Sequence, residues 1–120
     1  MFNQDCILIV EDDILVATDL ACQVEDLDGQ VAGPVGSVAE ALEILDRESV
    51  SGAILDANLV DRDVTPVGLV LAERGVPFIV HSALGLPTDL ERAVPAIRLV
   101  PKPAPSYVVI AHLLATMAGD

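Results

Sequence analysis

The chain has 120 residues, with 19 acids against six lysines and arginines and a formal net charge of −13, so residues 1–120 form one domain that repels the phosphates of nucleic acids and anionic membranes. Its hydrophobic fraction is 52%, yet charge or proline breaks every apolar run well short of the roughly 18 residues that cross a membrane. Residues 1–10 lack the basic start and cleavage site of a secretory signal, so we expect a cytoplasmic protein.

Short apolar segments predict buried strands, and amphipathic or capped segments between them predict helices. We expect strands at residues 6–10, 30–35, 52–56, 76–82 and 97–100. We expect helices at 13–27, from a capping box at 37–40, from the N-cap Thr65 to Gly75, from a capping box at 88–91 to just before Pro95, and at 106–117. This alternation predicts a parallel sheet with helices on both faces.

Residues that could carry chemistry follow four of these strands. Glu11 and Asp12 follow the first, Asp56 ends the third, Ser82 ends the fourth, and Lys102, the only lysine, follows the fifth. Because the carboxyl ends of parallel strands meet at one edge of a sheet, we expect these side chains to lie together. Acids with a single cation at this edge suit the handling of a divalent metal and a phosphoryl group.

Each of these residue types fits a step of phosphoryl transfer. Glu11 and Asp12 would hold Mg²⁺, or Mn²⁺ as a second candidate, beside Asp56. With charge repulsion relieved, Asp56 could attack phosphorus and form an acyl phosphate. Lys102 would balance the charge of the transferred oxygens, and the hydroxyl of Ser82 would donate a hydrogen bond to one of them.

Some of the polar residues have ordinary structural interpretations that stay open. Asp12 or Asp13 could instead cap the first helix. His81 and His112 have no partner acid nearby in the sequence, and we expect them to be structural. Taken singly, the other candidates could be turn or surface residues, and only their joint placement favours the chemical interpretation.

The motifs together resemble the receiver domain of two-component response regulators, over essentially all 120 residues. The resemblance rests on Ile7–Asp12, Leu55–Leu59, Ser82-Ala83 and Lys102-Pro103, in the order of the family and near its spacing. It implies a flavodoxin-like fold, which is a doubly wound, five-stranded parallel sheet of strand order 2-1-3-4-5 with helices on both faces.

The resemblance also implies roles for individual residues and partners. Asp56 would be the phosphoacceptor that becomes 4-aspartylphosphate, Glu11 and Asp12 the acidic pair serving Mg²⁺, and Asn58 a metal ligand through its backbone carbonyl. The donor would be a sensor histidine kinase or a histidine phosphotransfer protein, and the signal would pass to a downstream protein target. Catalysis would be limited to the transfer to Asp56 and its autocatalytic hydrolysis.

The sequence departs from the family at two switch positions. Ser82 stands where threonine is usual, which keeps the hydroxyl but loses a methyl group. Leu99 stands where an aromatic residue is usual, so the aromatic switch is absent or altered. The stretch from Asp56 to Ser82 is also short by about one helical turn, and 75–78 is similar to short-loop, stand-alone receivers.

The last predicted helix is unusual because residues 106–119 contain no Asp, Glu, Lys or Arg. A helix with one buried stripe normally carries charge on its other side. We therefore expect an exposed apolar patch at 106–117 that binds a second copy of the chain or another protein. The alternative is a helix that buries a wide apolar face.

Two other functions compete with a phosphorylatable receiver. A degenerate receiver would bind proteins without being phosphorylated, which Ser82 and Leu99 favour and the intact acids and Lys102 oppose. A Mg²⁺-dependent phosphatase with Asp56 as nucleophile would need a general acid two residues later, where this chain has Asn58. If Asp120 is the natural end, we expect no DNA-binding or enzymatic output module.

Overall fold

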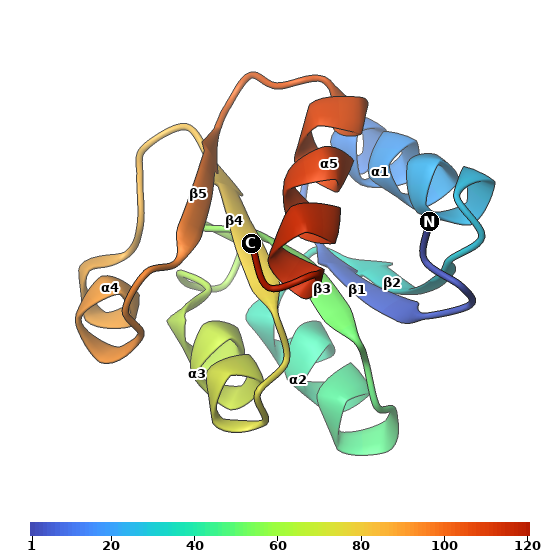
Figure 1. The fold of residues 1–120 in the computed structure, drawn as a ribbon. Helices are drawn as coiled ribbons and strands as arrows, with labels where there is room; N and C mark the ends of the chain where they lie inside the picture. Colours follow the sequence, from blue (N-terminus) through green and yellow to red (C-terminus); the bar gives the residue numbers. More distant parts are fainter.

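The computed structural model describes all residues from Met1 to Asp120. A five-stranded parallel sheet forms the centre, with strand order β2-β1-β3-β4-β5 (Figure 1). The elements are β1 (Cys6–Val10), α1 (Ile14–Asp26), β2 (Gln30–Val35), α2 (Val38–Arg47), β3 (Gly52–Asp56), α3 (Thr65–Glu73), β4 (Phe78–Ser82), α4 (Thr88–Ala93), β5 (Arg98–Pro101) and α5 (Ser106–Met117). The predicted flavodoxin-like fold is therefore confirmed.

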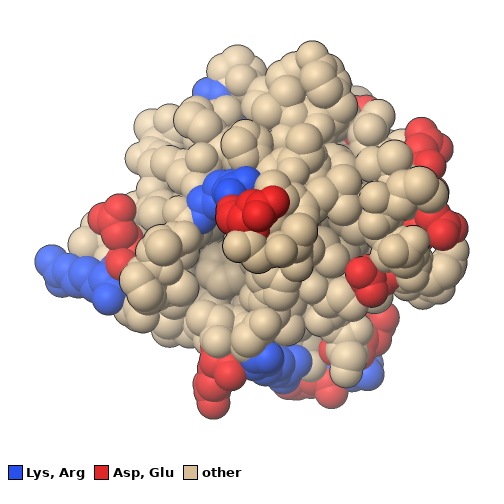
Figure 2. Space-filling view, viewed as in Figure 1, with Lys and Arg blue, Asp and Glu red and all other residues tan.

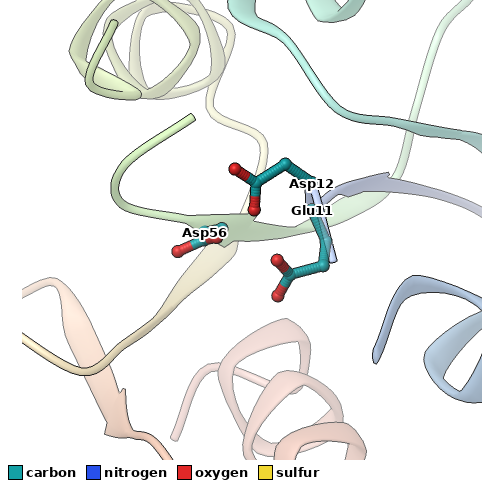
Figure 3. Close-up of side chains that lie close together, drawn as sticks. All are labelled: Glu11, Asp12 and Asp56. Atoms are coloured by element: carbon teal, nitrogen blue, oxygen red, sulfur yellow. The ribbon is translucent and has the colours of Figure 1, made fainter. Parts of the chain in front are cut away.

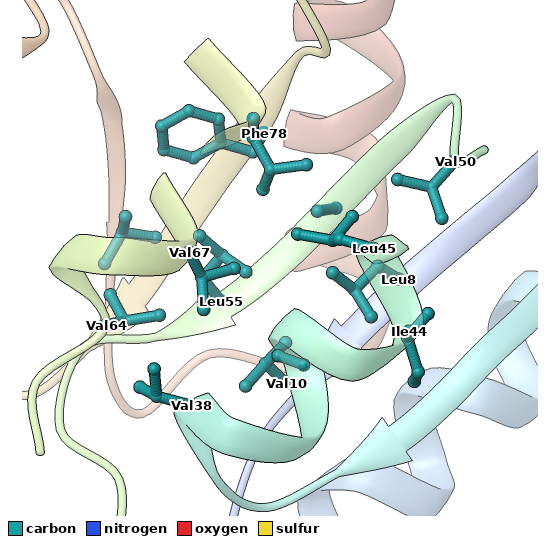
Figure 4. Close-up of a cluster of buried hydrophobic side chains, with 14 of the residues drawn as sticks. Leu8, Val10, Val38, Ile44, Leu45, Val50, Leu55, Val64, Val67 and Phe78 are labelled. Carbon is teal, nitrogen blue, oxygen red and sulfur yellow. The ribbon is translucent and has the colours of Figure 1, made fainter. Parts of the chain in front are cut away.

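Two apolar clusters fill the two faces of this sheet. Alternate strand residues point to opposite faces, so Leu8 and Val10 join one cluster while Ile7 and Ile9 join the other. Figure 4 shows the first cluster, in which β1, β3 and β4 pack against α2 and α3. The second cluster packs the opposite face against α1 and α5, which lie side by side in Figure 1.

The same alternation decides which polar residues share a face. Ile54, Ile79 and Val100 all belong to the cluster under α1 and α5. Two positions further along each strand, the chain reaches Asp56, His81 and Lys102. These three residues therefore lie at the carboxyl edge of the sheet on the α1–α5 face.

Two of the predicted helix boundaries are confirmed and one needs correction. Ser37 caps α2, because its Oγ accepts from the backbone N–H of Glu40 at 3.1 Å. Gly75 follows the end of α3 with φ +69°, a conformation that glycine adopts without strain. Thr65 is not the N-cap of α3. The helix already includes it, and Asp63 Oδ1 accepts from its N–H at 2.9 Å.

The boundaries near α4 also differ from prediction. The predicted capping box at 88–91 is wrong, since Thr88 is already helical and α4 has no side-chain cap. Pro87 takes the N-cap position with a non-helical backbone of φ −57° and ψ 135°, and it cannot supply a side-chain acceptor. Strand β4 begins two residues later than predicted and β5 one residue later, while the two-turn length of α4 is right.

Helix α5 buries or half-buries most of its large apolar side chains. Three of them are fully buried: Val109, Ile110 and Leu113. Leu114 and Met117 are half-buried against the apolar cluster under α1 and α5. The alternative of a helix with a wide buried face therefore accounts for most of the apolar residues of α5. Tyr107 stays 67% exposed. The face of the molecule drawn in Figure 2 is largely uncharged, apart from adjoining basic and acidic side chains near its centre. Self-association through this helix stays a prediction.

None of the helices combines the length and the apolar character needed to cross a membrane. Two peptide bonds are cis, both preceding proline: Gly33-Pro34 and Lys102-Pro103. The second of these bonds directly follows the only lysine of the chain.

Candidate functional site

Three carboxylates meet where β1 and β3 end. Glu11, Asp12 and Asp56 each place an oxygen within 4.8 Å of the others, and Figure 3 shows them converging from the two neighbouring strands. Residues 7–10 of β1 pair with residues 52–55 of β3 in parallel register, so the next residues of both strands reach the same level. The structure thus brings together the three acids that the sequence singles out.

Lys102 enters this acidic cluster from the end of β5. Its Nζ lies 2.9 Å from Glu11 Oε1 and 3.4 Å from Asp56 Oδ2. Its backbone N–H donates to the carbonyl of Ser82 at 2.9 Å, which extends the β4–β5 pairing past the strand end. The lysine therefore reaches two acids that lie 91 and 46 positions earlier in the chain.

Asp13, rather than Asp12, caps helix α1. Asp13 Oδ1 accepts from the backbone N–H groups of Leu15 and Val16 at 3.0 and 3.4 Å. The N–H of Asp13 donates to Glu11 Oε2 at 3.1 Å. This division leaves the carboxylate of Asp12 free to face the cluster, and it settles the choice that the sequence left open.

Burial and neighbouring charges shift the pKa values of Asp56 and Lys102. Burial, followed by the neighbouring Glu11, raises the pKa of Asp56 above its ordinary value, although Lys102 acts in the opposite direction. Burial alone would lower the pKa of Lys102, but its contacts with Glu11 and then Asp56 raise it overall. The folded chain therefore holds a cluster of acids with one firmly protonated cation.

The remaining predicted site residues lie around this cluster. Ser82 ends β4, is only 2% exposed, and its Oγ accepts from the N–H of Leu84 at 3.2 Å. Asn58 is exposed in the loop after β3, where it bridges to Asp63. Leu99 is half-buried against the cluster under α2 and α3, so it lies on the face opposite to Lys102.

Comparison with known proteins identifies the arrangement. No protein-family model and no curated protein matches the chain, but solved structures do. A response regulator receiver protein from Sinorhizobium medicae WSM419 is 21% identical, with a TM-score of 0.84 and 98% of each chain covered. SdrG from Sphingomonas melonis Fr1 is 32% identical over 98% of this chain and 99% of that chain, with a TM-score of 0.76. A signal receiver domain of a histidine kinase from Syntrophus aciditrophicus is 26% identical over 96% and 91%, with a TM-score of 0.78.

The chain belongs to the response regulator receiver domains. Membership places it in two-component signalling. It also implies a divalent cation, and the residues of this receiver fit one. Carboxylate oxygens are the ligands that Mg²⁺ prefers. Burial, and then the neighbouring Glu11, raises the pKa of Asp56, and a bound cation would oppose both effects. Glu11, Asp12 and Asp56 would hold the ion, with the carbonyl of Asn58 as a further candidate.

The structural role expected of His81 stays a prediction, but the structure places this residue beside the acidic cluster. His81 pairs in register with Asp56, is 3% exposed, and has no protein hydrogen-bond partner at either ring nitrogen. It borders a cavity of about 220 Å³ between α1 and the segment that follows Lys102. Burial, and then the charge of Lys102, lowers its pKa, so the imidazole stays neutral. The two-residue alternation of β4 was the signal that could have placed it beside the acids.

We expect His81→Leu to stabilise the receiver by about 1 kcal/mol at pH 7, since it removes a buried polar group that no protein atom satisfies. The gain should grow as the pH falls below about 6.5, where unfolded histidine takes up a proton that the folded site disfavours. Urea unfolding at pH 7.5 and 5.5 measures both effects. His112→Leu, which changes a half-buried histidine on α5, is the control. A variant less stable than wild type at both pH values would contradict the prediction.

Proposed function

We propose that this receiver, as a domain spanning residues 1–120, takes a phosphoryl group from a phosphohistidine donor onto Asp56 with Mg²⁺ bound. The observation that supports the proposal is the contact of Lys102 with Asp56, 3.4 Å apart, inside a cluster of three carboxylates. An acid nucleophile, a cation for the transferred oxygens and ligands for a metal are the parts that such a transfer requires.

The transfer would proceed from the side chains in place. A carboxylate oxygen of Asp56 forms a bond to phosphorus while the phosphorus–nitrogen bond of the donor breaks. The electron pair of that bond returns to the donor imidazole, and an acyl phosphate remains. When bound, Mg²⁺ supplies positive charge at the phosphoryl oxygens. Lys102 and the hydroxyl of Ser82 stabilise those oxygens, and later attack of water on phosphorus releases phosphate and restores Asp56.

Partners of this proposal are a sensor histidine kinase or a histidine phosphotransfer protein as donor, and a protein target as recipient of the signal. Ile14 and Leu15 begin α1 beside the acidic cluster and are 76% and 79% exposed. Exposed apolar side chains of this size mark a protein-contact surface. A phosphorylation-independent binding module is the second candidate, because Leu99 replaces the aromatic switch residue.

Intact mass tests the proposal after incubation with a small-molecule phosphodonor. We expect one phosphoryl adduct that requires Mg²⁺, disappears with EDTA and is absent from Asp56→Asn. Asp46→Asn removes an exposed acid at the end of α2 and should be modified like wild type. No adduct, where a known receiver in the same tube is modified, would favour the binding module instead.

A further inference from the structure

We propose that Asp61 is a positioning residue that ties the loop after β3 to helix α2 and so sets the affinity of the acidic cluster for Mg²⁺. The inference rests on the proposed function, because it concerns the same metal site. Asp61 itself lies outside the cluster, in the exposed part of the loop that joins β3 to α3.

The carboxylate of Asp61 makes a two-pronged contact with a distant helix end. Its Oδ1 accepts from the N–H of Val38 at 2.9 Å, and its Oδ2 accepts from the N–H of Ala39 at 3.1 Å. These are the first two residues of α2, whose N–H groups have no partner within the helix. The positive end of the helix dipole favours the same carboxylate. These hydrogen bonds, that of Val38 first, lower the pKa of Asp61, so it stays charged at neutral pH.

Asp61 also belongs to the compact turn that carries Asn58. The N–H of Leu59 donates to the carbonyl of Arg62 at 3.1 Å, and Asn58 bridges to Asp63 across this turn. A second bond, from the N–H of Arg62 to Asp61 Oδ1 at 3.1 Å, fixes the carboxylate within the turn. A shift of Asp61 would therefore move the backbone of Asn58 with it.

The same end of α2 is packed against the other metal-binding segment. A Cβ atom built on Gly36, just before α2, would lie 3.4 Å from the Cα of Asp12. The N–H of Glu11 donates to the carbonyl of Val35 at 2.8 Å. The turn that leads into α2, Val35 and Gly36, thus contacts the segment of Glu11 and Asp12, while Asp61 links the first residues of α2 to the segment of Asn58. Loss of the Asp61 contact would leave the three acids of the cluster in place. The segment that carries Asn58 would, however, no longer be held to the segment that carries Glu11 and Asp12.

A matched pair of variants separates this role from simple helix capping. Asp61→Ala removes a cap that joins two segments, whereas Ser37→Ala removes the cap that the residue directly before α2 provides. We expect Asp61→Ala to weaken Mg²⁺ binding about tenfold, as loss of an outer-shell partner does, and Ser37→Ala to change it less than about twofold. Asp61→Asn keeps one acceptor and should fall between them.

Three measurements on the full chain distinguish the outcomes. Calorimetric titration with Mg²⁺ gives the dissociation constants, and hydrogen exchange without metal reports the opening of the Val38 and Ala39 amides. Both alanine variants should exchange faster at α2, but only Asp61→Ala should need more Mg²⁺ for half-maximal phosphorylation while keeping the rate at saturating Mg²⁺. Equal Mg²⁺ affinities for the two variants would overturn the inference. A wild-type chain that binds no Mg²⁺ would overturn the proposed function as well.

Discussion

Lys102→Met should destabilise the receiver by about 3 kcal/mol in the absence of Mg²⁺, the lower end of the range for breaking a buried ion pair, because the side chain of Lys102 is 23% exposed. The side chain of Glu11 is only 2% exposed, and its Oε1 lies 2.9 Å from Lys102 Nζ. Without the lysine, Glu11 faces Asp12 and Asp56 with no compensating cation. Methionine keeps an unbranched apolar side chain as far as the Cε position, so the loss mainly measures the removal of the ammonium group. Urea unfolding at pH 7.5 with EDTA gives the free energy.

The pH dependence of this deficit follows from the acids. The folded pKa of Asp56 is already raised by burial and Glu11, and loss of Lys102 raises it further. A raised acid pKa means that folded-state stability falls as the pH rises through it. The deficit should therefore shrink on acidification, when the carboxyl groups take up protons. Arg92→Met removes an exposed cation on α4 and should change stability by less than about 0.5 kcal/mol.

A charge-preserving variant separates stability from catalysis. Lys102→Arg should keep most of the stability, because a cation still faces Glu11. Its planar guanidinium cannot place a single donor as the ammonium does, so phosphorylation of Asp56 should slow, and Lys102→Met should slow it by about 10²–10³-fold. If Lys102→Met proves as stable as wild type at pH 7.5, the ion pair contributes nothing and this account of the cluster is wrong.

The sequence predicted the elements well because strands and helices depend on local patterns. The predicted starts of α3 and α4 were wrong because a residue outside the recognised sequence pattern determined where each helix begins. Ser37 caps its helix as predicted, whereas Thr88 does not, because Pro87 before it holds a non-helical backbone and becomes the N-cap. Thr65 is already helical, Val64 holds the N-cap position without a side-chain bond, and Asp63 Oδ1 accepts from the N–H of Thr65. Both errors concern which residue stands outside the helix, and propensity alone leaves that open.

The candidate site was predictable to the extent that parallel strands share an edge. That rule places Glu11, Asp56 and Lys102 together, and the structure has them in contact. It says nothing of Asp61, whose partners on α2 lie 22 and 23 positions away and share no motif with it. Nor can a sequence motif show that Asp13, not Asp12, caps α1, since both are good N-cap residues.

If Mg²⁺ binds as proposed, it should raise the thermal stability of the wild-type receiver, because the ion would bind the folded cluster and not the unfolded chain. At a free Mg²⁺ concentration 100 times the dissociation constant, the gain is about 2.7 kcal/mol, which corresponds to several degrees in Tm for a domain of this size. The response should be lost in Asp12→Asn, since Asp12 is the acid of the cluster that the structure leaves unpaired. Scanning calorimetry across a Mg²⁺ series measures it.

The neighbouring acid provides the control for that prediction. Asp13→Asn removes an equal charge one residue away but retains a good N-cap for α1, so it should keep the Mg²⁺ response. KCl at matched ionic strength should give little stabilisation, because screening acts on exposed charges more than on Asp56, which is 8% exposed. Equal gains from KCl and MgCl₂ would show general screening of a chain with net charge −13. A gain specific to Mg²⁺ that depends on Asp12 and not on Asp13 would require a cation held by the cluster itself.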